Sequence, residues 1–250
     1  MKNIIHIRHN FKSLLEEKKY VDADGVKTLE LIGEGFICSE DRIFGTPNEQ
    51  YIEKELEWYK SCNRNVYGME NPPTIWKNVA DEDGNINSNY GWCIFTNENG
   101  NQYNNVIKEL KSNKHSRRAH MIYTRPSMHK DFNVKGMSDF MCTSGVVYEI
   151  RHNKLHAVVQ MRSNDVRFGF LNDYAWQLDV LESMVVELNV DYPELTAGDI
   201  IWNSASLHIY ENQWYLVYHY AKTNEITITK KEFKELYKKQ IESGEIYWNL

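Results

Sequence analysis

Residues 145–162 have the sequence GVVYEIRHNKLHAVVQMR, and this stretch decides the fold class. Its two ends, residues 145–150 and 155–162, are short runs rich in β-branched and aromatic residues, as is typical of strands. The polar residues RHNK between them have the composition of a hairpin turn. The stretch therefore predicts two neighbouring strands joined by a tight turn.

Further strands and helices are predicted on both sides of this hairpin. Residues 198–203 (GDIIWN) and 214–220 (WYLVYHY) have strand composition, and residues 225–229 (EITIT) alternate as a strand does. Apolar residues at helical spacing predict helices over residues 51–62 and 102–111. Because helices and strands follow one another without a regular βαβ alternation, we expect an α+β fold on a mixed sheet.

Two later segments carry helix signals of their own. Residues 171–189 should start near Asn172 or Asp173, which are good N-cap residues, and should bury one face made of Trp176, Val180, Met184, Val185 and Leu188. Thr229 and Glu232 have the spacing of a capping box. We expect them to open a helix that turns Phe233, Leu236 and Tyr237 inward.

The composition excludes several classes of protein. The chain has 29 basic and 35 acidic side chains, a formal net charge of −6, and 42% apolar residues. This balance argues against a broad nucleic-acid surface and against disorder. No stretch approaches the roughly 20 apolar residues of a membrane span, and the charged N-terminus lacks the apolar core of a secretory signal. We expect a cytoplasmic protein that binds neither nucleic acid nor membranes.

Cys142 is the first candidate for chemistry. The four cysteines, Cys38, Cys62, Cys93 and Cys142, have no zinc or disulfide spacing, so we expect reduced thiols and no metal site. Cys142 stands just before the first predicted strand of the hairpin. It is either a small buried hydrophobe or a nucleophile, and a nucleophile would need a nearby cation that the adjacent sequence does not supply.

Two groups of basic residues are candidates for an anion site. Arg162 and Ser163 follow the second strand of the hairpin, and Arg117 and Arg118 form a pair upstream of it. An arginine offers a fork of donors to a phosphate, and a serine adds a hydroxyl donor. The alternative for both groups is a solvated turn.

Three further features are open to two interpretations. Glu55, on an aromatic-rich helix, is either a catalytic acid or base or a surface carboxylate. His208 and Tyr210 alternate on one side of an extended segment, where they bind a ligand or form a half-buried pair. Residues 75–92 form a long polar segment with tryptophans near its ends, which predicts an irregular and functional loop.

Together these segments resemble the thymidylate synthase family. Matching motifs occur in the family's order between about residues 20 and 225: KELEWY (54–59), IWKNVA…YG (75–91), SRR (116–118), MCT (141–143), MRSND (161–165) and ASLHIYEN (205–212). Several ordered motifs are far more specific than one, so the resemblance favours the catalytic interpretation of Cys142.

The departures from the family pattern indicate one branch of it. Thr143 stands where the family has a histidine, Met161 where it has a glutamine, and Val79 where it has a tryptophan. The segments GFLNDYAWQ, TRPSM and GMSDFMCT resemble the deoxycytidylate 5-hydroxymethyltransferases that some phages encode. Their pyrimidine-recognising aspartate falls on Asp173, although Asn172 beside it offers an amide.

The resemblance implies a fold and a reaction. We expect one catalytic domain over residues 1–250, with a large mixed β-sheet, helices packed on one face, and a sheet-to-sheet homodimer. The reaction would transfer a one-carbon unit from 5,10-methylenetetrahydrofolate, a co-substrate, to C5 of dCMP. Water would then add, giving 5-hydroxymethyl-dCMP and tetrahydrofolate.

The resemblance also implies roles for individual residues. Cys142 would attack C6 of the base, Asp173 would recognise the pyrimidine with Asn172 beside it, and Glu55 would order water and move protons. The other implied roles are phosphate binding by Arg162 and Ser163, by Arg117 and Arg118 of the second subunit and by Lys27; sugar binding by His208 and Tyr210; and folate contact by Asp165, Trp76 and Val79.

Hydrogen-bond chemistry supports an aspartate as the reader of cytosine. Cytosine presents a 4-amino donor and an N3 acceptor, whereas uracil presents an O4 acceptor and an N3–H donor. A carboxylate accepts from the amine, and a protonated carboxyl can donate to N3. Against uracil, an ionised Asp173 would meet O4, a buried mismatch that costs about 1–3 kcal/mol.

Other functions stay open at this point. The chain could be a thymidylate synthase, which delivers hydride in place of water, or a hydroxymethylase acting on dUMP or ribo-CMP. It could also be a nucleotide- or RNA-binding relative that has lost catalysis.

Overall fold

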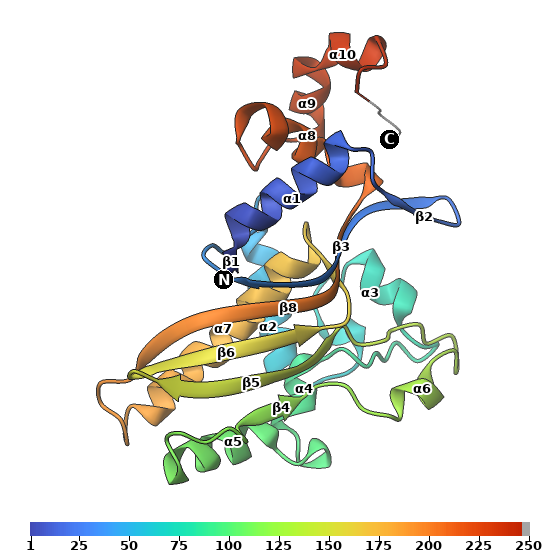
Figure 1. Ribbon diagram of the computed structural model, residues 1–250. Coiled ribbons are helices and arrows are strands. Elements are labelled where there is room, and N and C mark those ends of the chain that lie inside the picture. The colour runs from blue at the N-terminus through green and yellow to red at the C-terminus, as the bar shows by residue number, and fades with distance from the viewer. Residues whose placement is uncertain (247–250) are drawn as a thin grey trace. The chain divides into compact units, whose positions relative to one another are not determined.

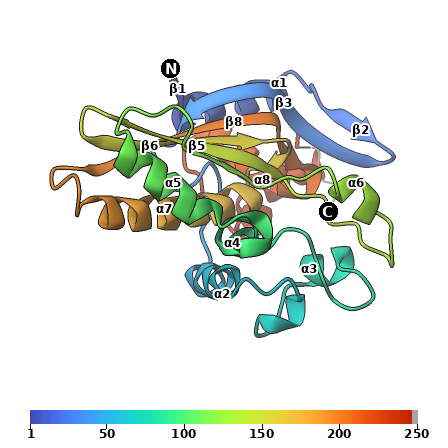
Figure 2. The same ribbon diagram turned by 90° about the horizontal axis from the view of Figure 1, so that it is seen from below.

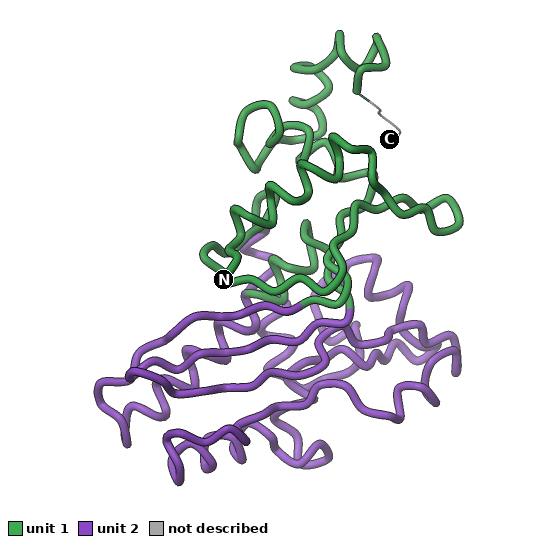
Figure 3. The backbone as a smooth tube through the Cα atoms, in the orientation of Figure 1, with its two compact units in different colours: residues 1–47, 163–174, 204–250 green, residues 48–162, 175–203 purple. Residues whose placement is uncertain are grey.

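The computed structural model describes residues 1–246 and divides the chain into two compact units (Figure 3). The described residues of unit 1 are 1–47, 163–174 and 204–246, and those of unit 2 are 48–162 and 175–203. Each unit is therefore assembled from separate stretches of the chain. A single catalytic domain over the whole chain stays a prediction.

Unit 1 combines strands of mixed direction with helices (Figure 1). Its elements are β1 (Lys2–Asn3), α1 (Ile4–Glu16), β2 (Val21–Ala23), β3 (Val26–Ile37), β7 (Asn164–Asp165), the start of α7 (Gly169–Leu188), the end of β8 (Thr196–Tyr210), η3 (Glu211–Gln213), α8 (Trp214–Thr223), α9 (Lys230–Leu236) and α10 (Lys238–Glu242). β1 pairs with β3 in parallel, β2 pairs with β3 antiparallel, and β7 runs parallel to β8. The mixed sheet that the sequence predicts is confirmed in this unit.

Helix α1 supplies much of the core of unit 1. Ile4, Ile7, Phe11 and Leu15 recur at helical spacing and are all buried, where α1 packs against β3 and α8. Burying such a face is the main source of stability for a helix of this length. Its first turn is closed by Asn3, which accepts from the backbone N–H of His6 in a capping box.

Unit 2 is built on the hairpin that the sequence predicts. Its strands are β4 (His120–Ile122), β5 (Thr143–Arg151), β6 (Lys154–Met161) and the start of β8, with β4, β5 and β6 paired antiparallel. His152 and Asn153 form the turn and both have positive φ, 51° and 57°. The predicted hairpin and its turn are confirmed.

Unit 2 also contains helices, several of which lie on one side of these strands. They are α2 (Glu49–Lys60), η1 (Val66–Gly68), α3 (Thr74–Val79), α4 (Tyr90–Phe95), η2 (Asn97–Asn99), α5 (Gln102–Ser112), α6 (Met128–Asp131) and the remainder of α7. Figure 2 shows α4, α5 and α7 on the same side of β5 and β6. The helices predicted over 51–62 and 102–111 are confirmed as α2 and α5.

Helix α7 buries the face that its sequence predicts, but it begins earlier. Trp176, Val180, Met184, Val185 and Leu188 are all buried. The helix starts at Gly169, three residues or more before the predicted N-cap. Asp165 explains the difference, because its carboxylate accepts from the backbone N–H groups of Arg167 and Phe168 and shapes the turn that leads into the helix.

Two predicted strands are wrong. Residues 214–220 lie in helix α8, and residues 225–229 form neither strand nor helix. Nearly every side chain at the start of α8 is buried, so the segment lacks the polar positions that distinguish a helical period from a strand. Among the described residues, no strand pairs with residues 225–229. An alternating sequence forms a strand only where such a partner is available.

Two smaller expectations also need correction. Residues 75–92 are not one irregular loop, because α3 and α4 occupy parts of them. The Thr229–Glu232 capping box is confirmed, with Phe233 and Tyr237 buried, but Leu236 is 60% exposed. Among residues 1–246, no helix combines the length and the apolar character needed to cross a bilayer.

Candidate active site

Cys142 lies at the open end of the β5–β6 hairpin in unit 2, opposite the turn. It is partly exposed and stands between Met141 and Thr143, which are both fully buried. The pairing of β5 with β6 shifts register between Thr143 and Gly145, so a bulge follows the cysteine directly. Bulges re-aim side chains beside functional sites, and this one accompanies a thiol that stays accessible.

Arg162 supplies the cation that the sequence around Cys142 lacks. Its backbone N–H donates to the carbonyl oxygen of Cys142 at 2.9 Å, and its Nη2 lies 3.7 Å from Sγ. A guanidinium at this distance stabilises a thiolate, the form in which a cysteine acts as nucleophile. By contrast, burial raises the pKa of Cys93 to about 12 and raises that of Cys38 still further, so both stay thiols.

The guanidinium of Arg162 is oriented by main-chain oxygens. Nε donates to the carbonyl of Met141 at 2.9 Å, and Nη2 donates to the carbonyl of Phe140. The guanidinium also lies 5.2 Å from the centre of the Phe140 ring. These partners are neutral, so they hold the side chain in place and leave its charge able to bind an anion.

Glu55 is a buried acid rather than a surface carboxylate. It lies on α2, is 3% exposed, and accepts from the hydroxyl of Tyr51 and, at 3.1 Å, from Nε1 of Trp76. Burial raises its pKa to about 7, although both hydrogen bonds oppose the shift. A carboxyl group with this pKa can take up and release a proton at neutral pH.

Helix α3 brings two predicted folate contacts together. Trp76 is tied to Glu55, and its Nε1 also contacts the hydroxyl of Tyr51 at 3.0 Å. Val79 ends the helix half-buried, and its carbonyl accepts from the backbone N–H groups of Ser138 and Asp139 at 2.9 and 3.1 Å. The folate contacts themselves stay a prediction.

The sequence interpretation missed Asp139, which braces the loop before Cys142. This carboxylate is buried and accepts from the backbone N–H groups of Asn87 and Ser88, each at 2.7 Å, and from the hydroxyl of Ser88 at 2.7 Å. Burial raises its pKa, while these hydrogen bonds act in the opposite direction. Asp139 lies in the GMSDFMCT segment, which was the one available signal.

A second missed feature is a pair of arginines on one indole. The guanidinium groups of Arg64 and Arg125 lie 4.7 and 4.5 Å from the ring centre of Trp92. Both also donate to Oδ1 of Asn87, so they are tied to the same loop as Asp139. The two guanidinium groups repel each other, and the shared acceptor Asn87 Oδ1 and the face of the indole offset this repulsion.

Arg117 and Arg118 lie far from Cys142 within unit 2. Both are exposed on the loop between α5 and β4, and Arg118 pairs with Glu109 at 2.8 Å. The backbone N–H of Tyr148 donates to Ala119 beside them, six residues along β5 from Cys142. At about 3.3 Å per residue, this is a separation on the order of 20 Å. Their own cysteine is therefore out of their reach.

The predicted base reader lies in unit 1. Asp173 stands on the first part of α7, and its Oδ2 accepts from Nδ2 of Asn164 on β7 at 2.8 Å. Asn172 is about 100° away around the helix, so it faces another direction. The contact with Asn164 identifies Asp173, not Asn172, as the residue that faces β7.

Asp165 and Ser163 flank this pair in the sequence. Both carboxylate oxygens of Asp165 accept backbone N–H groups, from Arg167 at 3.1 Å and Phe168 at 3.0 Å. This turn-capping role was not predicted, and the predicted folate contact stays untested. Ser163 is half-buried directly before β7, and its phosphate contact is likewise a prediction.

The tautomer of His208 is set by a chain of hydrogen bonds in unit 1. Ser206 Oγ donates to Glu30 and lies 3.2 Å from Nδ1 of His208. Since a hydroxyl has one proton, Ser206 can only accept from the histidine, so Nδ1 carries hydrogen and Nε2 is the acceptor of the neutral ring. The His208 and Tyr210 rings contact each other edge-on at 5.1 Å, which confirms that they share one side of the strand.

Lys27 already has partners in unit 1. It lies 3.6 Å from Glu211 and 5.4 Å from the ring centre of Tyr20. It borders a cavity of about 180 Å³ that Tyr20 and Trp214 also line. Glu211 partly offsets the charge of Lys27, and the phosphate contact of this lysine stays a prediction.

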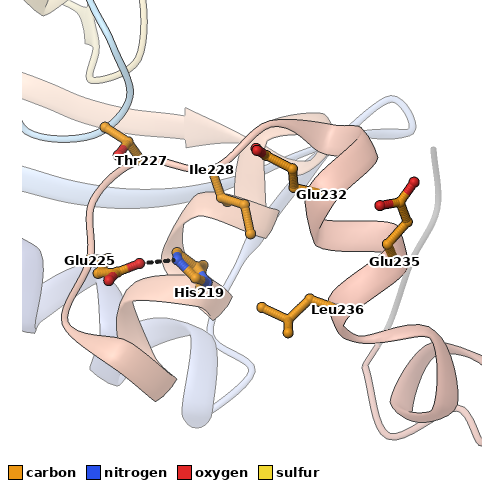
Figure 4. A pocket seen from close by; sticks show the side chains of 7 residues that line it. All are labelled: His219, Glu225, Thr227, Ile228, Glu232, Glu235 and Leu236. Atoms are coloured by element: carbon orange, nitrogen blue, oxygen red, sulfur yellow. Dashed lines mark hydrogen bonds and ion pairs between the residues drawn. The ribbon is translucent and has the colours of Figure 1, made fainter.

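A larger hollow of about 520 Å³ lies elsewhere in unit 1, between α8 and α9 (Figure 4). His219 in its wall pairs with Glu225 at 3.0 Å and with Tyr237 at 3.1 Å, and Glu232 belongs to the capping box. These polar groups serve the fold, and none of the predicted site residues lines this hollow.

Comparison with known proteins adds a family and its members. A model of the thymidylate synthase family matches residues 46–246. The chain is 52% identical over 232 residues to a deoxycytidylate 5-hydroxymethyltransferase of Enterobacteria phage T6, covering 91% of this chain and 94% of the relative. It is 52% identical over 231 residues to the protein of the same name from phage T4, with the same coverage. A thymidylate synthase of Francisella tularensis subsp. holarctica is 28% identical over 172 residues, or 64% of this chain and 61% of the relative.

Proposed function

The chain belongs to the thymidylate synthase family, and we propose that it transfers a one-carbon unit from 5,10-methylenetetrahydrofolate to C5 of dCMP. The products are 5-hydroxymethyl-dCMP and tetrahydrofolate. The observation that carries the proposal is the accessible sulfur of Cys142, 3.7 Å from Nη2 of Arg162. The relatives at 52% identity carry the name of this activity, which supports the choice of dCMP as substrate.

Cys142 begins the reaction by adding to the ring. Its thiolate forms a bond to C6 of the pyrimidine, and the electron pair of the C5–C6 double bond makes C5 a nucleophile. One of the two C–N bonds of the folate's methylene bridge opens to give an iminium, and C5 then forms a bond to its carbon. Loss of the C5 proton and of tetrahydrofolate leaves an exocyclic methylene on the ring. Water adds to this carbon, Cys142 is expelled, and the aromatic ring is restored.

Asp173 recognises the base and stabilises the intermediate. Its carboxylate accepts from the 4-amino group of cytosine and, when protonated, donates to N3. A proton that the carboxylate takes up as Cys142 attacks C6 is shared with N3 and stabilises the charge that builds up there. The hydrogen bond from Asn164 supports a defined orientation for this carboxylate.

Glu55 transfers protons and orders water in the site. Its pKa of about 7 lets it accept a proton and return it during one turnover at neutral pH. Because Val79 replaces a bulky aromatic residue of the family pattern, we propose that water reaches the exocyclic methylene through the space beside α3. A synthase would deliver hydride at this step instead.

The remaining residues bind the ends of the substrates. Arg162 and Ser163 hold the 5′-phosphate, Lys27 contributes to it, Asn172 borders the base, and His208 and Tyr210 hold the 3′-hydroxyl. Asp165, Trp76 and Val79 contact the folate. The distance along β5 between Arg118 and Cys142 supports a homodimer in which Arg117 and Arg118 serve the partner's phosphate site.

The test is product identification after incubation with dCMP and 5,10-methylenetetrahydrofolate. We expect mass spectrometry to find dCMP with one added CH₂O unit, and tetrahydrofolate as the second product. A methylated nucleotide with dihydrofolate would identify a synthase, and conversion of dUMP in preference to dCMP would contradict the assignment of the base. An unchanged nucleotide would favour a binding protein without catalysis.

A further inference from the structure

Asn164 is a buried amide whose donor is directed at one carboxylate. Only 3% of this residue is exposed, and its Nδ2 donates to Oδ2 of Asp173 at 2.8 Å. An ionised carboxylate has acceptors only, so the NH₂ end of the amide has to face it. The chemistry of the pair thus fixes the orientation of the asparagine.

The other end of this amide has no hydrogen bond. Oδ1 of Asn164 is buried, and it has no partner among the residues that the structure describes. A buried acceptor left unpaired costs about 1–3 kcal/mol. Leucine would fill a similar volume without this cost, so packing alone does not account for an asparagine here. The donor that it gives to Asp173 does.

The backbone around the pair is shaped to keep it together. The capped turn at Asp165 leads from β7 into α7, and Gly169 follows at the start of the helix. A Cβ at position 169 would lie 3.3 Å from Nδ2 of Asn164 and 3.8 Å from Oδ2 of Asp173. Glycine leaves the room in which the amide reaches the carboxylate.

We propose that Asn164 is a positioning residue that sets base specificity, because it holds the Asp173 carboxylate in one orientation and in its ionised form. This inference rests on the proposed function, in which Asp173 recognises the 4-amino group of dCMP. A donor facing a carboxylate favours the charged form. The ionised group accepts from an amine but has no proton to donate to O4 of uracil. Without the amide, Asp173 protonates at higher pH and accommodates dUMP.

Other charged groups near this part of unit 1 have partners of their own. Asp165 accepts two backbone N–H groups, Arg167 donates to the carbonyl of Thr46 at 3.4 Å, and His208 contacts Ser206. They are present unchanged in every variant considered below. A change between variants therefore reports on Asn164.

Two substitutions test the proposal, each measured as kcat/KM for dCMP and for dUMP across pH. Asn164→Leu removes the donor, and we expect the preference for dCMP over dUMP to fall at least about tenfold. Asn164→Asp places a second carboxylate beside Asp173, and the two then share a proton. We expect the acid limb of kcat/KM for dCMP to move to higher pH by at least about one unit.

Matched variants separate this role from general destabilisation. Val166→Ala removes buried volume from the same turn and should cost on the order of 1–3 kcal/mol of stability, yet leave the dCMP preference unchanged. Gly169→Ala pushes a methyl group toward Nδ2 of Asn164 and should lower the preference, less than Asn164→Leu does. If the leucine variant does not fold, Asn164→Asp and Gly169→Ala still give the answer.

The outcomes distinguish this inference from the function beneath it. Suppose that the wild-type protein converts dCMP, and that the folded Asn164 variants keep both its preference for dCMP over dUMP and its acid limb of kcat/KM. This result would overturn the role of Asn164 and leave the proposed function intact. A wild-type protein that leaves dCMP unchanged overturns the proposed function, and this inference with it.

Discussion

The sulfur of Cys142 lies 3.7 Å from Nη2 of Arg162, although twenty residues separate the two in sequence. The pairing of Thr143 with Met161 closes the open end of the hairpin, and it brings Cys142, which precedes Thr143, next to Arg162, which follows Met161. The register of β5 against β6 thus places the guanidinium that stabilises the thiolate.

The first prediction concerns Arg162. Arg162→Ala should slow alkylation of Cys142 by iodoacetamide at neutral pH, because the thiolate loses its cation. Arg162→Lys keeps the charge but loses the fork, and should raise the KM for dCMP by roughly 10–100-fold, since a charged hydrogen bond contributes about 1.5–3 kcal/mol. Cys62, a half-buried free thiol outside the candidate site, is the internal control for alkylation. An alanine variant whose Cys142 reacts at the wild-type rate contradicts this role.

Glu55 should make the stability of the protein pH-dependent. Its pKa is about 7 in the folded protein against an ordinary value of 4.5. The unfolded chain therefore ionises first, and the free energy of unfolding of the wild-type protein falls as pH rises through this window. Glu55→Gln does not titrate. Its stability relative to wild type should therefore increase between about pH 4.5 and pH 7, by up to about 3 kcal/mol, and stay constant above. Urea unfolding at several pH values measures this, and a constant difference would show that Glu55 is not buried as a neutral acid.

The same substitution should nearly abolish turnover. Glutamine keeps the shape and a hydrogen-bonding group but cannot exchange a proton, and general acid–base catalysis contributes typically 10²–10⁴-fold. A loss in kcat with little change in the KM for dCMP would identify a proton-transfer role. Full activity of the folded variant would remove Glu55 from the catalytic set.

Hybrid dimers test where Arg118 acts. Arg118→Ala and Cys142→Ser should each be inactive alone. If the arginine serves the partner subunit, mixing the two variants creates hybrids with one intact site, and about a quarter of the wild-type activity returns when subunits mix at random. No recovery, with subunit exchange shown by native mass spectrometry, would mean that the arginine acts within its own chain or not at all.

Val79→Trp should restrict access of water. The larger side chain at the end of α3 is expected to lower the rate of 5-hydroxymethyl-dCMP formation by at least about tenfold, equivalent to about 1.4 kcal/mol of barrier. Exchange of the C5 proton of dCMP, which precedes water addition, should continue. An unchanged hydroxymethylation rate would remove Val79 from the control of water.

The sequence predicts those parts of the fold that depend on local pattern. The hairpin around His152, the presence of helix α2, the buried face of α7 and the Thr229 capping box all follow from spacing and turn chemistry. Helix α8 does not, because burial of Trp214 to Val217 leaves no polar side from which to infer its period. The strand predicted over 225–229 fails for want of a pairing partner, which is a tertiary property.

The candidate site divides in the same way. Residue types and the family resemblance identify Cys142, Glu55 and Asp173, but the contacts that tune them come from tertiary packing. The burial of Glu55 depends on Trp76, twenty-one residues away. The amide of Asn164 stands inside a recognised motif, and its partner becomes visible only once β7 and α7 are placed.

The most direct test of the central claim is a covalent trap. With 5-fluoro-dCMP and 5,10-methylenetetrahydrofolate, the C5 substituent cannot leave as a cation, so the reaction should stop after both carbon bonds have formed. We expect intact-mass and peptide mass spectrometry to find nucleotide and folate joined to the peptide that contains Cys142. Protein that stays unmodified, or an adduct on Cys38, Cys62 or Cys93, would contradict it.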